Sequence, residues 1–245
     1  MRKFYLSTYH FLILFISILS WVYLLGFDYI NPTNISWLNS GDLSTYQLGW
    51  EYFRSDKWRF PIGLNPNYGI YSDSNIVYSD SIPILAIFFK LFNFLLPEKF
   101  QYFSIWILLC IYLQILFSYK IVYVGTGNRI FSLLGSLFFL TASIFIHRSG
   151  IHLSLLGQWL ILCGIYIEIS ENSKKDFLRL VTLLLSLLIH FYFFLMLMIL
   201  IFFQDCYKVL VLKKLFLEIL KKFIFTIFVS AVLMYAIGYF SINLD

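Results

Sequence analysis

Charged residues are scarce in this chain. Asp, Glu, Lys and Arg make up 13% of its 245 residues, whereas 60% are hydrophobic. A soluble domain has about 25% charged and about 45–50% apolar residues, and its surface must face water. The composition therefore excludes a soluble domain, a disordered chain and a nucleic-acid-binding protein. We expect an integral membrane protein, in which the net charge of +5 matters through its position relative to the bilayer.

Cysteines are few, and the common catalytic motifs are missing. Cys110, Cys163 and Cys206 lie in or beside apolar runs, at spacings that fit no metal or redox motif, and their odd number argues against a disulfide framework. The sequence has no phosphate-binding glycine loop, no nucleophile elbow and no His-Glu-x-x-His zinc motif. It also lacks the series of intramembrane carboxylates that is typical of ion pumps. The candidates that remain are small polar clusters.

Long apolar runs fill most of the chain. A transmembrane helix needs about 20 apolar residues, and several runs reach or approach this length. We therefore predict an all-α fold, a polytopic transmembrane helical bundle with about six to eight membrane segments. The predicted spans are Tyr5–Leu25, Tyr102–Tyr123, Ile130–Ile146, Leu153–Ile169, Leu178–Phe203 and Phe223–Tyr239.

The run Ile82–Leu96 leaves two topologies open, because it is short and bracketed by prolines. If it spans the membrane, the basic segment Lys174–Arg179 falls outside. If it is re-entrant or interfacial, this segment falls inside, as the positive-inside rule prefers. We favour the second topology, in which Leu178–Phe203 folds as two half-helices that return to the same side. The stretch Lys208–Lys222, within a basic segment 204–222, is then predicted to be an interfacial helix.

One long hydrophilic stretch, residues 26–81, interrupts the single membrane domain that we expect over residues 1–245. Arg2 and Lys3 keep the N-terminus cytoplasmic by the positive-inside rule, which makes this acidic stretch an extracytoplasmic first loop. Within the loop, Asp42–Phe53 is predicted to be an amphipathic juxtamembrane helix that lies on the outer membrane surface. Its apolar face consists of Leu43, Tyr46, Trp50 and Phe53.

Two carboxylates of this loop are candidates for chemistry. Asp42 opens the predicted amphipathic helix, where it is either a helix N-cap or a base or metal ligand at the membrane–water boundary. Asp80 directly precedes the next apolar run. It is likewise either a helix N-cap, with Pro83 in the first turn of the capped helix, or a base or metal ligand.

A basic island from His147 to His152 separates two apolar runs. It is either a connecting loop that Arg148 anchors to phospholipid, or a cationic pocket in which Arg148 grips a phosphate and the histidines donate hydrogen bonds or bind a metal. Gln158, about one and a half helical turns after His152, can line the same cavity. His190 lies at predicted membrane depth, where it is either a satisfied buried histidine or a site residue.

Six motifs carry a resemblance to a known group of enzymes. They are SGD (40–42), LGWEYFR (48–54), WRFPIGLNPNYG (58–69), IVYSDSIP (76–83), HRSGIH (147–152) and GQWL (157–160). Over roughly residues 5–205 the chain resembles the GT-C superfamily of multi-pass membrane glycosyltransferases. It resembles most closely a bacterial membrane family that is related to this superfamily.

The resemblance implies that a sugar passes from a polyprenyl-phosphate-linked donor to a cell-envelope acceptor, which is a glycan, a lipid or a protein. It implies that Asp42 is the catalytic base or a metal ligand, with Asp80 as a second carboxylate. The cation would be Mg²⁺ or Mn²⁺, and the membrane would be the bacterial inner membrane. The basic island and Gln158 would bind the substrate.

Members of the superfamily normally have more spans, so we expect this chain to be C-terminally incomplete. The alternatives to an enzyme are a glycolipid transporter, an assembly factor or an inactive truncated copy. Each of these would keep the fold without the reaction.

Overall fold

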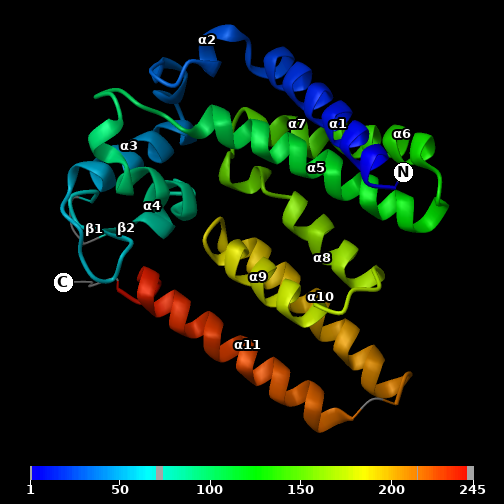
Figure 1. Cartoon of the computed structure of the whole chain (residues 1–245). Coiled ribbons are helices and arrows are strands. Elements are labelled where there is room, and N and C mark those ends of the chain that lie inside the picture. Colours follow the sequence, from blue (N-terminus) through cyan, green and yellow to red (C-terminus); the bar gives the residue numbers. More distant parts are fainter. Residues whose placement is uncertain (1, 70–73, 214, 242–245) are drawn as a thin grey trace. The chain divides into compact units, whose positions relative to one another are not determined.

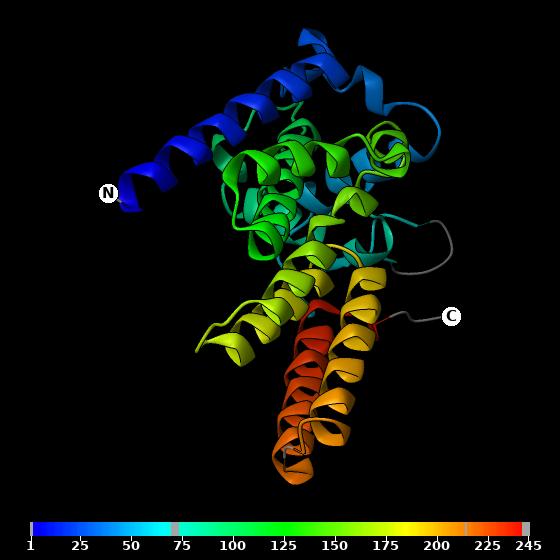
Figure 2. The same cartoon turned by 90° about the vertical axis from the view of Figure 1, so that its right-hand side faces the viewer.

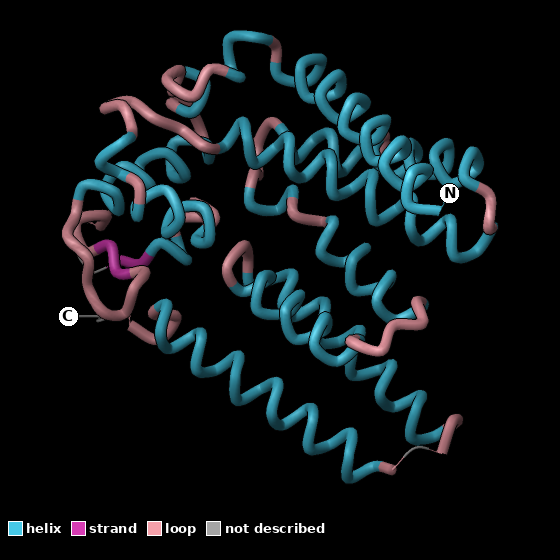
Figure 3. Tube along the Cα trace, in the orientation of Figure 1, coloured by secondary structure: helices cyan, strands magenta, loops and turns pink. Residues whose placement is uncertain are grey.

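The computed structural model describes residues 2–69, 74–213 and 215–241, with side chains from residue 9 onward. The side chains of Arg2 and Lys3, on which the predicted orientation rests, lie outside this description. Within it, eleven α-helices and one short antiparallel strand pair make up the fold, so the all-α prediction is confirmed (Figures 1 and 3). The elements are α1 Arg2–Leu25, α2 Phe27–Ile30, α3 Asp42–Ser55, β1 Leu64–Asn65, β2 Ser74–Asn75, α4 Pro83–Leu91, α5 Phe103–Thr126, α6 Arg129–Leu140, α7 Ser143–Ser149, α8 Trp159–Ile169, α9 Lys175–Leu187, α10 Phe191–Leu210 and α11 Phe216–Ile237.

The chain forms two units, each built from two segments of the sequence. Unit 1 comprises Met1–Gln47 and Leu95–Ser170, and unit 2 comprises Leu48–Phe94 and Glu171–Asp245. In unit 1, α5 is the central helix and packs against α1, α6 and α8. In unit 2, α9 packs against both α10 and α11, and Figure 2 shows α10 and α11 side by side.

Two helices of the described chain are long and apolar enough to cross a membrane, α5 with 24 residues and α10 with 20. A third candidate is the pair α6–α7, if its two helices form one span that bends by 56°. The predicted span Ile130–Ile146 falls within this bent pair, and whether it crosses the membrane stays a prediction. The Thr141 hydroxyl donates to the Phe138 carbonyl at 3.2 Å where α6 ends, a local hydrogen bond that competes with a continuing helix.

Two other predicted helices also have different boundaries. In Leu153–Ile169, residues 154–156 form a 3₁₀ turn, and only the part from Trp159 onward is α-helical. The predicted interfacial helix Lys208–Lys222 is wrong, because α10 ends and α11 begins within this stretch. Lys213 has a φ of +52° in the connection, a left-handed conformation that does not continue an α-helix.

The run Leu178–Phe203 is divided between two helices, α9 and α10, so the predicted break is present. The half-helix part of the prediction is wrong for α10, because its 20 residues are long enough to cross a membrane. Backbone groups at such a break need partners when their surroundings are apolar. The Tyr239 hydroxyl donates to the Leu187 carbonyl at 2.6 Å, and the Ile84 amide donates to the Leu188 carbonyl at 2.8 Å. The beginning of α4 and the end of α11 therefore meet the break between α9 and α10.

Helix α4 is too short to cross a bilayer. Its nine residues rise about 14 Å at about 1.5 Å per residue, whereas the hydrocarbon core is about 30 Å thick. Lys90 on this helix is buried, with its Nζ 4.0 Å from the centre of the Phe53 ring and 4.8 Å from that of Trp58. Burial lowers the pKa of Lys90 to about 8. These features agree with the topology in which Ile82–Leu96 does not span.

The predicted amphipathic helix is confirmed as α3, but its apolar face is covered by protein. Tyr46, Trp50 and Phe53 are buried, and Tyr46 packs edge-on against Phe103 in unit 1. The expectation that this face contacts lipid is therefore wrong, because protein side chains already cover it. The position of α3 relative to the membrane surface stays a prediction.

Gly49 on α3 allows a close approach to the segment that carries Asp80. A Cβ atom at position 49 would overlap the Ser79 side chain and lie 2.6 Å from Ser81 Oγ. The Asn65 side-chain amide donates to the Gly49 carbonyl at 2.9 Å. This hydrogen bond ties the same turn of α3 to the strand β1. Only glycine leaves room for this packing.

Replacement of Gly49 by Ala is therefore expected to lower the unfolding temperature of the detergent-purified protein. Overpacking costs about 1–3 kcal/mol, equivalent to a fall of roughly 2–10 °C in a chain of this size. The matched control is Gly125→Ala on α5, where a Cβ atom would have no heavy atom within 4 Å. A Gly49→Ala protein as stable as the wild type would contradict the packing argument.

Candidate functional site

Unit 1 brings two of the predicted site residues together. Asp42 Oδ2 lies 3.7 Å from His152 Nδ1, and the two side chains are 63% and 41% exposed. This separation suits an ion pair when the histidine is protonated, and it is longer than a hydrogen bond. Asp42 is the first residue of α3, where the helix dipole favours a negative charge. In the described chain no hydrogen bond from the helix reaches its carboxylate, so the N-cap alternative lacks support.

The central helix of unit 1 positions both members of this pair. The Trp106 indole on α5 is buried and donates to the Leu153 carbonyl at 2.7 Å, directly after His152. Tyr46 of α3 packs against Phe103, one turn earlier on α5. One rigid helix thus sets the distance between Asp42 and the end of the basic island.

The orientation of the ring determines what the pair can do. His152 turns Nδ1 toward the carboxylate, and Nε2 makes no hydrogen bond within the described residues. A carboxylate on the Nδ1 side orients the ring and leaves Nε2 free to accept a proton from a substrate. Catalytic hydrogen bonds are often long before substrate binds, so a separation of 3.7 Å is compatible with this function.

Arg148 supplies a donor without an acceptor. Its side chain is partly exposed, yet Nη1 is buried and has no hydrogen-bond partner in the described part of the chain. A buried unpaired donor costs about 1–3 kcal/mol, and more when it is charged. A phosphate oxygen would remove this cost, since guanidinium groups bind phosphate through short charge-assisted hydrogen bonds.

The two remaining residues predicted for this site are less closely associated with it. His147 is exposed in the last turn of α7, and Gln158 is partly exposed where α8 begins. The helical register expected from His152 to Gln158 is wrong, because the 3₁₀ turn at Ser154–Leu156 separates them. Within the described residues, no hydrogen bond or ion pair joins His147 or Gln158 to Asp42.

Unit 2 contains a second carboxylate–histidine pair. Asp80 Oδ1 lies 3.3 Å from His190 Nε2, and the side chains are 43% and 13% exposed. The N-cap alternative for Asp80 is contradicted, because α4 begins at Pro83 with Ile82 as its capping residue and no side-chain cap. The Asp80 side chain reaches His190 instead of the helix.

The backbone around Asp80 is strained. Asp80 and Ile82 have φ values of +56° and +53°, a region that a β-branched residue such as isoleucine rarely adopts. Such conformations cost about 1–3 kcal/mol each and persist only when the surroundings enforce them. Here the Ser79 and Ser81 hydroxyls lie 2.9 Å apart in a hydrogen bond, and both residues are buried. These buried contacts enforce the conformation in which the Asp80 carboxylate lies beside His190.

His190 fixes its own tautomer by capping α10. Its Nδ1 atom accepts a hydrogen bond from the Tyr192 amide at 3.2 Å, so in the neutral ring the proton lies on Nε2. Nε2 then lies 3.3 Å from Asp80 Oδ1, a distance that suits an electrostatic contact with the carboxylate. Because both ring nitrogens are engaged, His190 orients the carboxylate and is not available as a base. Within the described residues the second carboxylate oxygen of Asp80 accepts no hydrogen bond.

Tyr68 lies in the electrostatic field of this second pair. Burial and the neighbouring Asp80 carboxylate raise the pKa of the Tyr68 phenol. The phenol therefore stays protonated and can act as a hydrogen-bond donor. Neither Tyr68 nor the His190 pairing with Asp80 was predicted. The signal for His190 was its position in an apolar run that is too long for one span.

The residues do not fit a resident metal ion in either unit. Mg²⁺ and Mn²⁺ prefer several oxygen ligands, but each site offers one carboxylate beside one histidine. Among the described residues no three His, Cys, Asp or Glu side chains come together as a metal site. The metal role suggested for Asp42 and Asp80 therefore has no support from the donor set. The two carboxylates also belong to different units, and their action in one active site stays a prediction.

Comparison with known proteins places the chain in a family but not among proteins of known activity. A family model, described as a domain of unknown function (DUF6311), matches residues 14–245. No curated protein and no solved structure matches the chain.

The His190 tautomer can be measured by ¹⁵N NMR of histidine-labelled protein at alkaline pH, where free histidine is neutral. We expect His190 to show a protonated Nε2 and an unprotonated Nδ1, because α10 needs the Nδ1 acceptor. Assignment comes from the loss of the signal in His190→Gln. Exposed His147 is the control and should show both tautomers. A protonated Nδ1 in His190 would overturn its assignment as a helix cap.

Proposed function

We propose that this chain, which belongs to the DUF6311 family, is a membrane glycosyltransferase that uses a polyprenyl-phosphate-linked sugar. The observation that carries the proposal is the arrangement in unit 1, where Asp42 faces His152 and nearby in sequence Arg148 has a buried donor without a partner. These residues supply a base and a phosphate-binding cation. The acceptor would be a glycan, lipid or protein of the cell envelope.

In the proposed reaction, Asp42 and His152 handle the proton. The acceptor hydroxyl attacks the anomeric carbon of the donor sugar, a new C–O bond forms, and the bond from this carbon to the phosphate oxygen breaks. The hydroxyl proton passes to the Asp42 carboxylate or to His152 Nε2. Proton transfer to a positioned side chain typically contributes about 10²–10⁴-fold to the rate.

Arg148 is assigned to the leaving group. Polyprenyl phosphate departs with the electron pair of the broken bond and needs no general acid, but its growing negative charge needs stabilisation. The unpaired Nη1 of Arg148 is suited to this, with His147 as a second cationic or donor group in the same island. The prenyl tail would remain in the apolar part of the membrane.

Asp80 is proposed as the second carboxylate of the reaction. His190 holds one of its oxygens, and the other can accept a hydrogen bond from a sugar or acceptor hydroxyl. The Tyr68 phenol can donate to the same substrate. A carboxylate fixed in this way positions a hydroxyl group without a metal ion.

The membrane arrangement that we propose has about six to eight membrane segments. It adds α1, α8, α9 and α11 to the two or three candidate spans, which gives six or seven of these segments. In unit 2 the basic residues Lys175, Arg179 and Lys208 lie at the ends of α9 and α10 opposite His190. The positive-inside rule then orients this end toward the cytoplasm and the Asp80–His190 pair toward the outside.

Reporter fusions test the proposed topology. Alkaline phosphatase, active only outside the cytoplasm, is expected to be active when fused after Ser149 and inactive when fused after Arg129 or Lys175. Fusions to green fluorescent protein at the same positions serve as controls, since they should give the reverse pattern. A cytoplasmic signal after Ser149 would refute the arrangement.

Sugar transfer in membrane preparations tests the catalytic assignment. With polyprenyl-phosphate sugars as donors, Asp42→Asn is expected to lower the transfer rate by about 10²-fold or more, because the proton acceptor is lost. His152→Gln should cause a smaller loss. The matched control is Asp28→Asn, which neutralises another exposed carboxylate of the same loop. Wild-type transfer by the Asp42→Asn protein would remove Asp42 as the base.

A further inference from the structure

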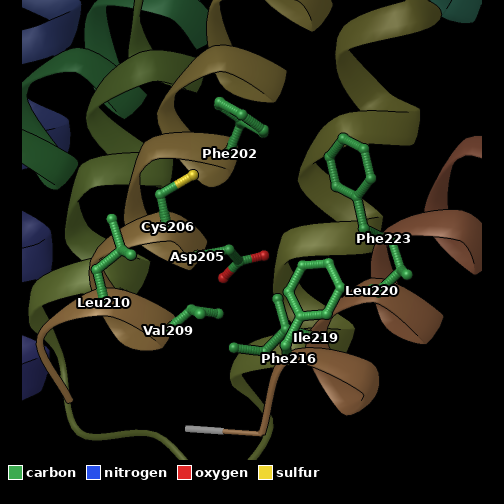
Figure 4. A pocket seen from close by; sticks show the side chains of 9 residues that line it. All are labelled: Phe202, Asp205, Cys206, Val209, Leu210, Phe216, Ile219, Leu220 and Phe223. Carbon is green, nitrogen blue, oxygen red and sulfur yellow. The ribbon is translucent and has the colours of Figure 1, made fainter. Parts of the chain in front are cut away.

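The hairpin of α10 and α11 encloses an apolar groove near its tip. The groove has a volume of about 250 Å³, and Figure 4 shows side chains from both helices turned toward one another around it. Its lining consists of Phe202, Asp205, Cys206, Val209, Leu210, Phe216, Ile219, Leu220 and Phe223.

The one charged residue in this lining does not make the groove polar. Arg179 donates to Asp205 Oδ1 at 3.0 Å, and Lys208 donates to the same oxygen at 2.8 Å. Both the Arg179 and the Asp205 side chains are largely buried. The remaining lining is aliphatic, aromatic or thiol, so an occupant has to be apolar.

Several lysines lie close in sequence to the residues that line this groove. The described part of the hairpin contains four lysines near the groove, Lys208, Lys213, Lys221 and Lys222. Its acidic residues are Asp205 and Glu218. Lys208 pairs with Asp205, and Lys222 pairs with Asp176 of α9 at 2.6 Å. Within the described residues Lys213 and Lys221 are exposed and take part in no ion pair.

The tip also exposes large apolar side chains between these lysines. Leu210, Leu215 and Leu217 are each more than 60% exposed. An apolar surface interspersed with basic residues is typical of protein regions that contact the headgroup–acyl boundary of a membrane. Water is therefore an unfavourable environment for this end of the hairpin.

We propose that the α10–α11 groove binds an acyl chain of an anionic phospholipid, with the headgroup held by Lys213 and Lys221. A volume of about 250 Å³ is below the range of about 300–1,000 Å³ that is typical of pockets for drug-sized ligands, and it suits a narrow hydrocarbon chain. Each lysine near an anionic membrane surface contributes about fivefold to binding. A second copy of the chain is disfavoured as the occupant, because it would bring the same positive charges.

This assignment is independent of the proposed glycosyl transfer. The positive-inside rule would place the groove in the cytoplasmic leaflet, where anionic lipids are enriched. The lipid would then hold together the ends of α10 and α11, which are joined only by a short connection. It has the character of a structural or regulatory lipid rather than a substrate.

Native mass spectrometry of the purified full-length protein can test the proposal. Phosphatidylglycerol and phosphatidylcholine with identical acyl chains are titrated separately. We expect phosphatidylglycerol to bind more tightly to the wild type. Lys213→Gln combined with Lys221→Gln should reduce this preference about 10- to 30-fold, while binding of phosphatidylcholine changes little.

Groove-filling variants separate the acyl-chain site from simple charge attraction. Cys206→Trp should reduce the binding of both lipids at least tenfold, and Val209→Phe provides a second variant if the first fails to fold. Phe228→Trp is the matched control, because Phe228 is exposed on α11 outside the groove. Unchanged lipid binding in a folded groove-filling variant would overturn the proposal. So would equal binding of the two lipids to the wild type, or a dimer that the groove-filling variants dissociate.

Discussion

Backbone groups that are freed where a helix breaks in apolar surroundings must find partners inside the protein. This constraint organises unit 2. The carbonyls at the end of α9, Leu187 and Leu188, accept hydrogen bonds from Tyr239 and Ile84, and His190 caps the first turn of α10. Four helix ends are thereby drawn to one place. The same cap sets the contact with Asp80. Because Nδ1 of His190 accepts the capping hydrogen bond, Nε2 is the nitrogen that lies beside the Asp80 carboxylate.

The two carboxylate–histidine pairs share their composition but differ in chemistry. His152 presents Nδ1 to Asp42 and keeps Nε2 available, which is the orientation of a proton acceptor supported by a carboxylate. His190 presents Nε2 to Asp80 and has Nδ1 bound to the backbone, so both of its ring nitrogens already have partners. Residue types alone would assign both pairs the same role. The ring orientation distinguishes a histidine that can move protons from one that holds a neighbour in place.

Sequence periodicity predicted much of the fold, and the failures have physical causes. The amphipathic face of α3 was predictable, because Tyr46, Trp50 and Phe53 recur at helical spacing, but periodicity does not show whether protein or lipid covers a face. The bend between α6 and α7 was not predictable, because no proline or glycine lies at it. The α6 helix ends at a hydrogen bond from the Thr141 side chain. The grouping of Asp42 with His152 followed from their shared polarity at the ends of apolar runs. The pairing of Asp80 with His190 depends on tertiary contacts of α4 with the break in α9–α10, which no local pattern contains.

The interleaving of the two units has a consequence for biogenesis. Residues 48–94 of unit 2 are synthesised long before residues 171–245, yet the Ile62 amide bonds to the carbonyl of Ala236, about 140 residues after the first segment ends. At a translation rate of about 5–20 residues per second, the first segment waits roughly 7–30 s for its partner. During that time its aromatic side chains have no final packing. Unit 2 can therefore close only after unit 1 has left the ribosome, and the order of the gene imposes an order on membrane assembly.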